Sequence, residues 1–434
     1  MKSRAAWLAG MLIVRTSLAQ VTLPRLPDLP VPLPEPGSLL SDTASVASEV
    51  VRSSTRLRAN ALLRRFPQQI DRDPRGAPVV RSVIIALSPG PQALQRAEDA
   101  GYQILSDADL APLGERAVTL LAPRDLSTQR ALQQLRQLDP DGSYDFDHLY
   151  VESATPGAVP MSAAAGSTSA PGRTHSRVRI GLIDGGIDLA HPAFASQLPE
   201  QRGCGGKRYP DAHGTAVASL LVGNALPVFK GAAPGAPLIA IDVYCGLAEP
   251  GGRVRDIIAA LAELAGSDVA VINISMVGPD NAVLKAVISK VLARSIIVVA
   301  AAGNDGPRAA PLYPAAYPGV VAVTGVDAHD KVLLEACSGK HVLFAAPGAD
   351  MVAAEPGGRY QVVRGTSYAA PLVAGLIASH LADDSAATPQ LVLQKLEAAA
   401  RDKGKKGRDV RYGYGVVASE LRTPPSTLAG KPEE

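Results

Sequence analysis

Apolar residues in the second half of the chain fall into short continuous runs, and these alternate with longer segments in which apolar positions recur at helical spacing. Near-continuous runs are expected where both faces of a parallel sheet are covered. The pattern predicts strands at 178–183, 237–244, 269–275, 295–301 and 320–326, and helices at 214–224, 254–265, 282–294, 367–381 and 389–400. We therefore expect a doubly wound α/β domain with a mostly parallel sheet over residues 177–421, with its functional residues at the carboxyl ends of strands.

Residues 78–152 carry a second pattern, in which shorter strands and helices alternate. Strands are expected at 79–87, 102–105, 117–121 and 144–151, and helices at 91–100 and 127–138. This combination predicts a small α+β domain in front of the larger one.

The N-terminus carries a targeting pattern rather than a core pattern. Residues 1–19 have basic residues, then a short apolar core, then Ser17-Leu18-Ala19, which predicts a secretory signal cleaved after Ala19 and an exported protein, secreted or periplasmic. The alternative is a buried N-terminal helix. No uninterrupted apolar run reaches the roughly 18 residues that would span a bilayer, so we expect no stable membrane anchor.

Three further segments connect or flank the domains. Residues 20–77 combine a Pro-rich spacer at 23–36 with helical spacing at 41–66, which predicts an amphipathic helix that packs on the next domain. A membrane-surface helix is the alternative. Residues 153–176 are rich in Ala, Ser, Gly and Pro and predict a flexible linker that contains the maturation cut, and residues 422–434 predict a loose tail.

Composition narrows the functional classes. The 434-residue chain is 47% hydrophobic and 19% charged, with a net charge of +2. That length is typical of two or three globular domains. The charge is too small to indicate binding to nucleic acid or to an anionic membrane surface, so neither is an expected partner.

Candidate chemistry begins at the motif Gly-Thr-Ser-Tyr-Ala-Ala-Pro at 365–371, where a strand or loop passes into a helix. A serine hydroxyl at a helix N-terminus is well placed to act as a nucleophile, although Ser and Thr also favour that position as simple caps. A serine nucleophile needs a nearby base, and the base needs an orienting acid. Three upstream motifs supply candidates: Asp184 after a buried strand, His213 at the start of a small-residue helix, and Asn304 after an apolar strand.

These four motifs, in the order Asp, His, Asn, Ser, resemble those of the subtilisin-like serine peptidases, the subtilases. The resemblance covers residues 176–420. It implies that Ser367 is the nucleophile and His213 the general acid and base. It further implies that Asp184 orients His213 and that Asn304 donates a side-chain hydrogen bond to the oxyanion.

Three positions depart from the usual motifs of that family. Gly185 stands where a small hydroxyl residue is usual, Ala216 replaces a second histidine, and Tyr368 follows the nucleophile where methionine is common. None of the three removes a reacting group. Gly185 does remove one hydrogen bond that would help to fix the end of the strand.

The resemblance also implies how the other segments are used. A small α+β domain before a subtilase catalytic domain resembles a propeptide that assists folding and then acts as an intramolecular inhibitor. An independent interaction module is the alternative. The walls of the pocket for the side chain before the cleaved bond are small or apolar, which favours uncharged side chains over Lys or Arg. The residues expected to form these walls are Ser275, Met276, Val277, Gly278, Ala301 and Gly303.

Cysteine is sparse. Cys204 lies before the histidine helix and Cys245 follows the next strand, so the two are a candidate disulfide, which would stabilise the fold by roughly 3 to 4 kcal/mol in the chain-entropy model. Cys337 is expected to be a buried free thiol, because no histidine motif accompanies it.

We therefore expect a monomeric serine endopeptidase that hydrolyses protein or peptide substrates, requires no cofactor and is made as a self-processing zymogen. The competing interpretation is an exported pseudopeptidase that acts as a binding or scaffold protein. No catalytic metal is expected. Carboxylates that offer ligands for a structural calcium, without a compact loop that assigns them to one site, are Asp188, Asp305 and Asp350.

Overall fold

The computed structural model describes residues 55–155, 160–161, 178–196, 198–225, 229–246, 251–384 and 386–428. All of them fall within one compact unit, Val46–Glu434. The predicted secretory signal, the Pro-rich spacer, most of the predicted linker and the end of the predicted tail lie outside the described residues. Of the predicted helix at 41–66, the described part is α2 (Thr55–Arg65).

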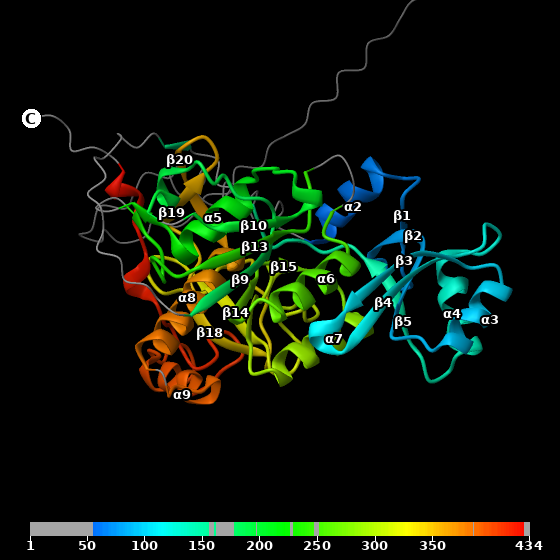
Figure 1. Ribbon diagram of the computed structural model, residues 1–434. Helices are drawn as coiled ribbons and strands as arrows, with labels where there is room; N and C mark the ends of the chain where they lie inside the picture. Colours follow the sequence, from blue (N-terminus) through cyan, green and yellow to red (C-terminus); the bar gives the residue numbers. More distant parts are fainter. Residues whose placement is uncertain are drawn as a thin grey trace, which may run out of the picture. The chain divides into compact units, whose positions relative to one another are not determined.

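The larger region is built on a seven-stranded parallel sheet (Figure 1). Of its strands, β9 comes first in the chain and lies inside the sheet, and later strands are added on both sides of it. In spatial order the strands are β10 (Glu200–Gly203), β13 (Leu238–Asp242), β9 (Arg179–Asp184), β14 (Val269–Ile274), β16 (Ile297–Ala301), β17 (Val321–Val326) and β18 (Val342–Pro347). This arrangement confirms the predicted doubly wound α/β class.

Helices cover both faces of this sheet, and alternate residues of each strand point to opposite faces. In β16, Val299 packs with α5 (Ala212–Val222) and α8 (Thr366–Asp383), whereas Val298 packs with α6 (Val254–Ala265) and α7 (Ala282–Ala293). This explains the continuous apolar runs in the sequence. A further helix, α9 (Pro389–Ala399), packs on the face of α5 and α8.

Several strands of the larger region were not predicted. The edge strand β10 has the polar sequence Glu-Gln-Arg-Gly, so it lacks the apolar run of a buried strand. The others are β18, the short pair β11 (Asn224–Ala225) and β12 (Phe229–Lys230), and the hairpin of β19 (Met351–Glu355) and β20 (Arg359–Gly365). The predicted helix at 254–265 has the same bounds as α6.

The smaller region has a five-stranded antiparallel sheet. Strand β2 lies inside this sheet and pairs with β1, β4 and β5. Helices α3 (Pro91–Asp99) and α4 (Thr128–Leu138) follow β2 and β4 in the chain, and α4 packs on this sheet. The strands are β1 (Ile70–Arg72), β2 (Pro78–Leu87), β3 (Gln103–Leu110), β4 (Glu115–Leu121) and β5 (Ser143–His148).

The two faces of the small sheet pack against different partners. In β2, Ile84 packs with α4, whereas Ile85 joins the hydrophobic cluster that contains α6 and α7. Figure 1 shows α6 and α7 on the side of the large sheet that faces the small one. The small region therefore covers two helices of the large region with the apolar face that α4 leaves uncovered.

Carboxylates of β5 reinforce this contact at the starts of the two helices. Asp145 Oδ2 accepts a hydrogen bond from the backbone N–H of Ala282 at 2.7 Å, at the start of α7. Asp147 accepts one from the backbone N–H of Arg255 at 3.2 Å and pairs with the Arg255 guanidinium at 3.2 Å. Free N–H groups at helix starts are satisfied by such acceptors. Two helices of the large region thus receive acceptors from the small one.

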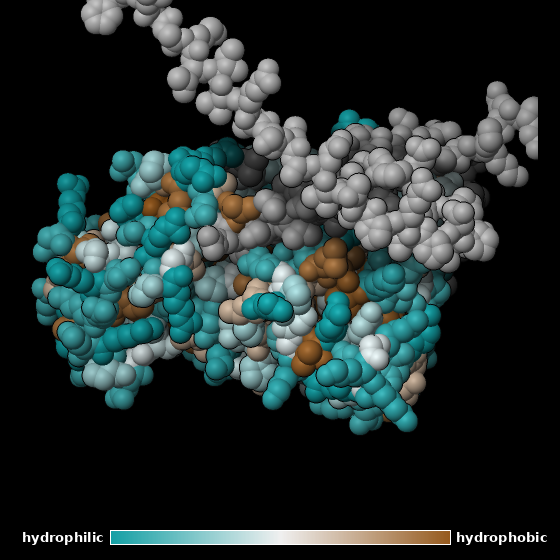
Figure 2. All heavy atoms as spheres, turned by 180° about the vertical axis from the view of Figure 1, so that it is seen from behind, coloured by the Kyte–Doolittle hydropathy of each residue, from teal (hydrophilic) through white to brown (hydrophobic). Residues whose placement is uncertain are grey.

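None of the described helices is both long enough and apolar enough to cross a membrane. Figure 2 shows a face on which hydrophilic residues predominate and hydrophobic residues form small clusters. Most large apolar side chains of the described residues are instead packed in the cores on the two faces of the seven-stranded sheet and beneath α4.

Candidate active site

A buried carboxylate and a buried imidazole meet where β9 ends and α5 begins. Asp184, the last residue of β9, places Oδ1 2.8 Å from Nδ1 of His213. Both side chains are 1% exposed or less. The carboxylate also accepts a hydrogen bond from the backbone N–H of Gly185 at 2.7 Å. A carboxylate at Nδ1 favours the proton on that nitrogen, which leaves Nε2 for other partners.

Local sequence explains why the histidine reaches this strand end. Asp211 caps α5, and its Oδ1 accepts hydrogen bonds from the backbone N–H groups of His213 and Gly214 at 2.7 and 3.0 Å. A Cβ atom on Gly214 would lie 2.3 Å from the Gly185 carbonyl oxygen, so only glycine allows this approach. A Cβ atom on Gly185 would lie 3.0 Å from Asp211 Oδ1. Glycine at 185 therefore leaves room for the cap of the histidine helix.

Ser367 lies in the first turn of α8, two residues after Gly365, whose backbone conformation only glycine adopts readily. Gly365 has a φ of 143° and donates its N–H to the Gly348 carbonyl at 2.8 Å. Pro371 has no N–H, so it cannot donate to the carbonyl of Ser367 in the usual helical bond. The Ser275 hydroxyl donates to that carbonyl instead, at 2.9 Å. This bond ties β14 to the turn that carries Ser367.

Asn304 follows β16 and is held against the same helix start. The Thr366 backbone N–H donates to Asn304 Oδ1 at 3.2 Å, and the Gly303 N–H donates to the Thr366 hydroxyl at 3.1 Å. With Oδ1 occupied, the amide nitrogen Nδ2 faces elsewhere. It is buried and has no hydrogen-bond partner.

The site therefore holds unsatisfied polar atoms close together. His213 Nε2, Asp184 Oδ2 and Asn304 Nδ2 are all buried without a partner. Such atoms are few in native proteins because each one costs free energy. Ser367 Oγ does not pair with His213 Nε2; its partner is Ser153 Oγ, at 2.5 Å.

Ser153 belongs to an extended segment that crosses this site. The Tyr150 N–H donates to the Gly252 carbonyl at 2.7 Å, and the Ser153 N–H donates to the Ser275 carbonyl at 3.4 Å. Between them, β6 (Val151–Glu152) pairs antiparallel with β15 (Met276–Val277). The chain then continues as β7 (Ala154–Thr155) and β8 (Pro160–Met161), which both pair antiparallel with β20. The first residues of the predicted linker are thus paired in strands.

Charges of the segment and of the site influence each other. Burial raises the pKa of the Glu152 carboxyl to about 7, although His213 opposes this shift. Burial of the His213 ring lowers its pKa, but the negative charges of Asp184 and Glu152 outweigh burial and raise the pKa to about 9. While the segment lies in the site, this raised pKa favours the protonated imidazole at neutral pH, and the neutral imidazole that can accept a proton becomes more abundant as pH rises.

Comparison with known proteins agrees with this geometry. A model of the subtilase family matches residues 175–415. The chain belongs to the subtilase family. Subtilisin E of Bacillus subtilis (strain 168) is 32% identical over 306 residues, which cover 67% of this chain and 77% of that protein. A subtilisin of Bacillus pumilus is 33% identical over 259 residues, which cover 57% of this chain and 90% of that one.

A solved structure extends the likeness to the fold. Fervidolysin from Fervidobacterium pennivorans, a keratinolytic enzyme related to subtilisin, superimposes with a TM-score of 0.66 over 81% of this chain and 61% of its own, at 18% identity. At that identity the likeness concerns the fold alone. The family assignment makes this subtilase a serine endopeptidase.

The residues predicted to wall the substrate pocket of this subtilase lie in two groups. Ser275, Met276 and Val277 run along the extended segment, as the pairing above shows. Ala301 ends β16, and Gly303 follows it with a φ of 101°. Sequence reasoning missed Gly252, which accepts from Tyr150, and Arg58 of α2, which donates to the Glu152 carbonyl. In the sequence, Gly252 is only one of two adjacent glycines and Arg58 only one of several arginines in a helix, so neither position indicated a contact with the segment.

The cysteines and potential metal ligands lie as follows. Cys204 and Cys245 are joined by a disulfide with a Cα–Cα distance of 5.3 Å. Within the described part of the chain, they and Asp242 form the one grouping with the spacing of metal ligands, and the disulfide occupies both sulfur atoms. Cys337 is a buried free thiol, and burial raises its pKa to about 12, so it stays protonated.

Two of the carboxylates considered as calcium ligands accept hydrogen bonds from backbone N–H groups. Asp188 accepts N–H bonds from Ala190 at 3.1 Å and Gly357 at 2.7 Å. Asp350 accepts one from Ala328 at 2.9 Å. Each therefore fixes a turn or a loop contact.

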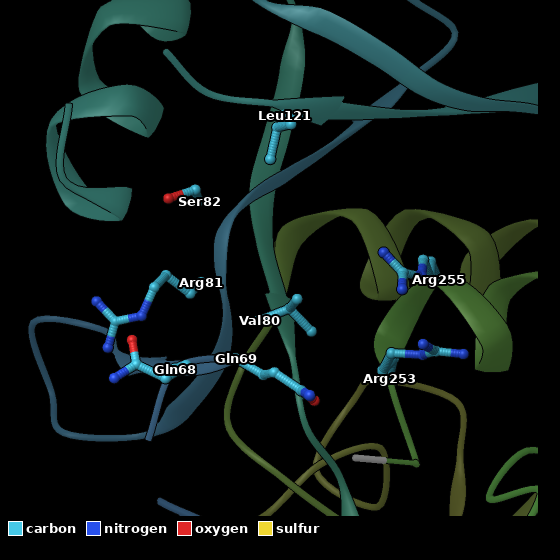
Figure 3. Close-up of a pocket in the computed structure, with 8 residues that line it drawn as sticks. All are labelled: Gln68, Gln69, Val80, Arg81, Ser82, Leu121, Arg253 and Arg255. Atoms are coloured by element: carbon cyan, nitrogen blue, oxygen red, sulfur yellow. The ribbon is translucent and has the colours of Figure 1, made fainter. Parts of the chain in front are cut away.

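A hollow on the protein surface lies between the small sheet and the start of α6 (Figure 3). Figure 3 shows Arg253 and Arg255 on the α6 side, opposite Arg81 and Gln69. Arg81 donates to the Ile70 carbonyl at 3.0 Å, and Arg255 pairs with Asp147. This hollow is a polar seam between the two regions, and its lining includes no residue of the Ser367 site.

Proposed function

We propose that Ser367, His213 and Asp184 form the catalytic triad of this protease, that Asn304 and the Ser367 N–H stabilise the oxyanion, and that the first substrate is the bond between Ser153 and Ala154 of the same chain. One observation carries this proposal. An extended segment pairs with β15 before Ser153 and with β20 after it, so that this bond passes beside Ser367. Peptides bind many proteases in this strand-like way.

The proposed reaction uses the atoms that lack partners. Ser367 Oγ attacks the Ser153 carbonyl carbon while His213 Nε2 takes the hydroxyl proton, and Asp184 stabilises the imidazolium. The oxyanion accepts hydrogen bonds from Asn304 Nδ2 and from the Ser367 N–H at the start of α8. The C–N bond to Ala154 then breaks, and His213 gives its proton to the departing amine. Water repeats the sequence on the acyl-enzyme and releases Ser153 as a carboxylate.

The small region fits the role of a propeptide. Its carboxylates Asp145 and Asp147 satisfy helix starts of the large region, and its last strand leads directly into the site. Arg58 of α2 donates to the Glu152 carbonyl and so holds the segment from its outer side. After cleavage at Ser153, the same contacts keep the product in place as an inhibitor until it is released.

Export of the zymogen completes this proposal. The N-terminal pattern of residues 1–19 supports it, since a basic start, an apolar core and small residues before Ala19 are typical of a secretory signal. The disulfide between Cys204 and Cys245 also suits an oxidising compartment.

The test compares wild-type and Ser367→Ala chains by intact mass and by digestion of an unstructured protein. We expect the wild type to release a mature chain that begins at Ala154 and to digest the substrate. The Ser367→Ala chain is expected to stay intact and inactive. Ser289→Ala, on the exposed side of α7, is the matched control and should behave as the wild type. Equal behaviour of the wild-type and Ser367→Ala chains would contradict the triad, and a cut elsewhere would contradict the assigned bond.

A further inference from the structure

The space beside Ser153 is bounded by two walls, and one leucine joins them. The first wall is the strand that runs from Ser275 to Gly278, and the second is the turn at Gly303. The backbone of Tyr313 pairs with Gly278, with N–O distances of 2.9 and 3.0 Å in the two directions. The preceding residue, Leu312, reaches the other wall.

The contact of Leu312 with Gly303 is unusually close. A Cβ atom built on Gly303 would lie 2.5 Å from Leu312 Cδ1 and 3.4 Å from Cys337 Sγ. The leucine side chain is thus packed directly on the glycine backbone, and Cys337 closes the same corner. Leu312 thus bridges the two segments expected to wall the pocket for the side chain at position 153, which leaves less room there for a long side chain than for serine.

Three residues earlier, the segment places a large side chain in the large region, because Tyr150 is buried there. Its side chain is fully buried in the cluster formed by α6, α7 and the large sheet. The hydroxyl donates to the Pro279 carbonyl at 2.5 Å. A Cβ atom on Gly278 would lie 2.6 Å from the ring, so this glycine makes room for it. The pocket therefore has both the size of a tyrosine and an acceptor for its hydroxyl.

We infer that this protease selects substrates with a small residue directly before the cleaved bond and a tyrosine three residues before that, and that Leu312 and Gly278 set the two preferences. This inference rests on the proposed function, because it takes residues 150–153 as a bound substrate. Val151 and Glu152 between them are held by backbone pairing with β15, which any residue except proline can make.

The test uses peptides with the chain's own sequence at 150–155, Tyr-Val-Glu-Ser-Ala-Thr, and the self-processed wild-type enzyme. Replacing the serine by alanine should change kcat/KM little, whereas leucine or phenylalanine should lower it about 10- to 100-fold because the occupied space must open. Replacing the tyrosine by phenylalanine should lower kcat/KM about 5-fold through the lost hydrogen bond, and replacing it by alanine should lower it about 100-fold or more.

Two substitutions then test the assigned residues. Leu312→Gly should raise kcat/KM for the leucine and phenylalanine peptides, relative to that for the serine peptide, about 10-fold or more, with Leu312→Ala intermediate. Gly278→Ala should lower kcat/KM for the tyrosine peptide by a clearly larger factor than for the peptide with alanine at that place. Leu198→Gly, at a side chain that is 70% exposed, is the matched control and should alter neither preference.

The outcomes separate the inference from the proposed function. If the wild type cleaves the leucine and phenylalanine peptides as fast as the serine peptide, the inference is wrong and the triad stands. If Leu312→Gly folds and leaves the preference unchanged, Leu312 does not set it. If no peptide is cleaved by the wild type and the chain also fails to process itself, the proposed function is wrong and the inference falls with it.

Discussion

Buried charged groups of the candidate active site and of β5 are held in position in different ways. In the large region, Asp184 and His213 are fixed by each other and by backbone groups of β9 and α5. In the small region, Asp145 and Asp147 accept hydrogen bonds from the backbone N–H groups of Ala282 and Arg255 in the large region. The first arrangement is complete within one region. The second is complete only when the two regions are docked.

This difference assigns different physical roles to the two regions. The large region can hold its reacting groups in place on its own, because their supports are strand ends and helix starts. The small region would expose or leave unpaired its buried carboxylates if it separated, so its stability depends on docking. Changes in the large region should therefore affect chemistry, and changes in β5 or Glu152 should affect docking and release.

The largest effect is expected from Asp184→Asn. The amide keeps the shape of the carboxylate but cannot favour the reacting tautomer of His213 or stabilise its positive charge, so kcat should fall about 10,000-fold. Kinetics of the mature enzyme on the peptide described above measure this. The melting temperature should change little, and a large fall in melting temperature would instead indicate that Asp184 acts mainly through the fold.

Asn304→Ala should have the next largest effect. It removes Nδ2, the buried donor without a partner, and we expect kcat to fall about 100- to 1,000-fold with KM nearly constant. Thr366→Ala is the control for the other end of this side chain, since it loosens the Gly303 turn and leaves Nδ2 in place. A drop in kcat for Thr366→Ala as large as that for Asn304→Ala would contradict a direct role of the amide.

The proposed catalytic residues could be identified from sequence because they stand beside strong local signals. Asp184 and Asn304 end apolar runs, and His213 and Ser367 begin helices of small residues, so their positions follow from the alternation of strands and helices. The confirmed fold class rests on the same periodicity. The path of residues 150–155 carried no such signal, because it depends on pairing with strands more than one hundred residues away.

Other features were missed for similar reasons. The polar edge strand β10 lacks an apolar run, and the role of Leu312 depends on its contact with Gly303 across the site. The disulfide partners were identified as candidates from their places beside successive elements. Long-range side-chain contacts of this kind have no periodic pattern, so they emerge only from the folded arrangement.

A smaller effect, confined to docking, is expected from Asp147→Ala. In the Ser367→Ala chain, which cannot cut itself, this change removes a charged acceptor from Arg255 and should weaken docking by about 2 kcal/mol, which speeds amide hydrogen exchange at 149–153 roughly 30-fold. Asp141→Ala, at an exposed position of the same region, is the matched control. Unchanged exchange in Asp147→Ala would show that the apolar contacts alone hold the two regions together.

The smallest effect concerns pH and links the two regions at one side chain. The pKa of His213 is raised to about 9 partly by Glu152, so self-cleavage of the wild type should rise with pH as the imidazole loses its proton. Glu152→Gln removes one negative charge and lowers the pKa of His213, which should move this rise to lower pH by about one unit and speed self-cleavage at pH 7 up to about 10-fold. The rate of appearance of the chain that begins at Ala154, measured from pH 5 to 9, gives the shift.

The same charges determine how docking of the segment depends on pH. The pKa of Glu152 is raised from 4.5 to about 7 by burial, so its docking is strongest below pH 4.5 and weakens as pH rises through 7. In Glu152→Gln this weakening, which spans about pH 4.5 to 7, should diminish, and Glu98→Gln, an exposed change in α3, should retain the wild-type profile. Identical pH profiles of self-cleavage for Glu152→Gln and the wild type would show that Asp184 alone sets the pKa of His213. In that case the small region would influence the site only by occupying it, and the charge of its last residues would have no part in the timing of maturation.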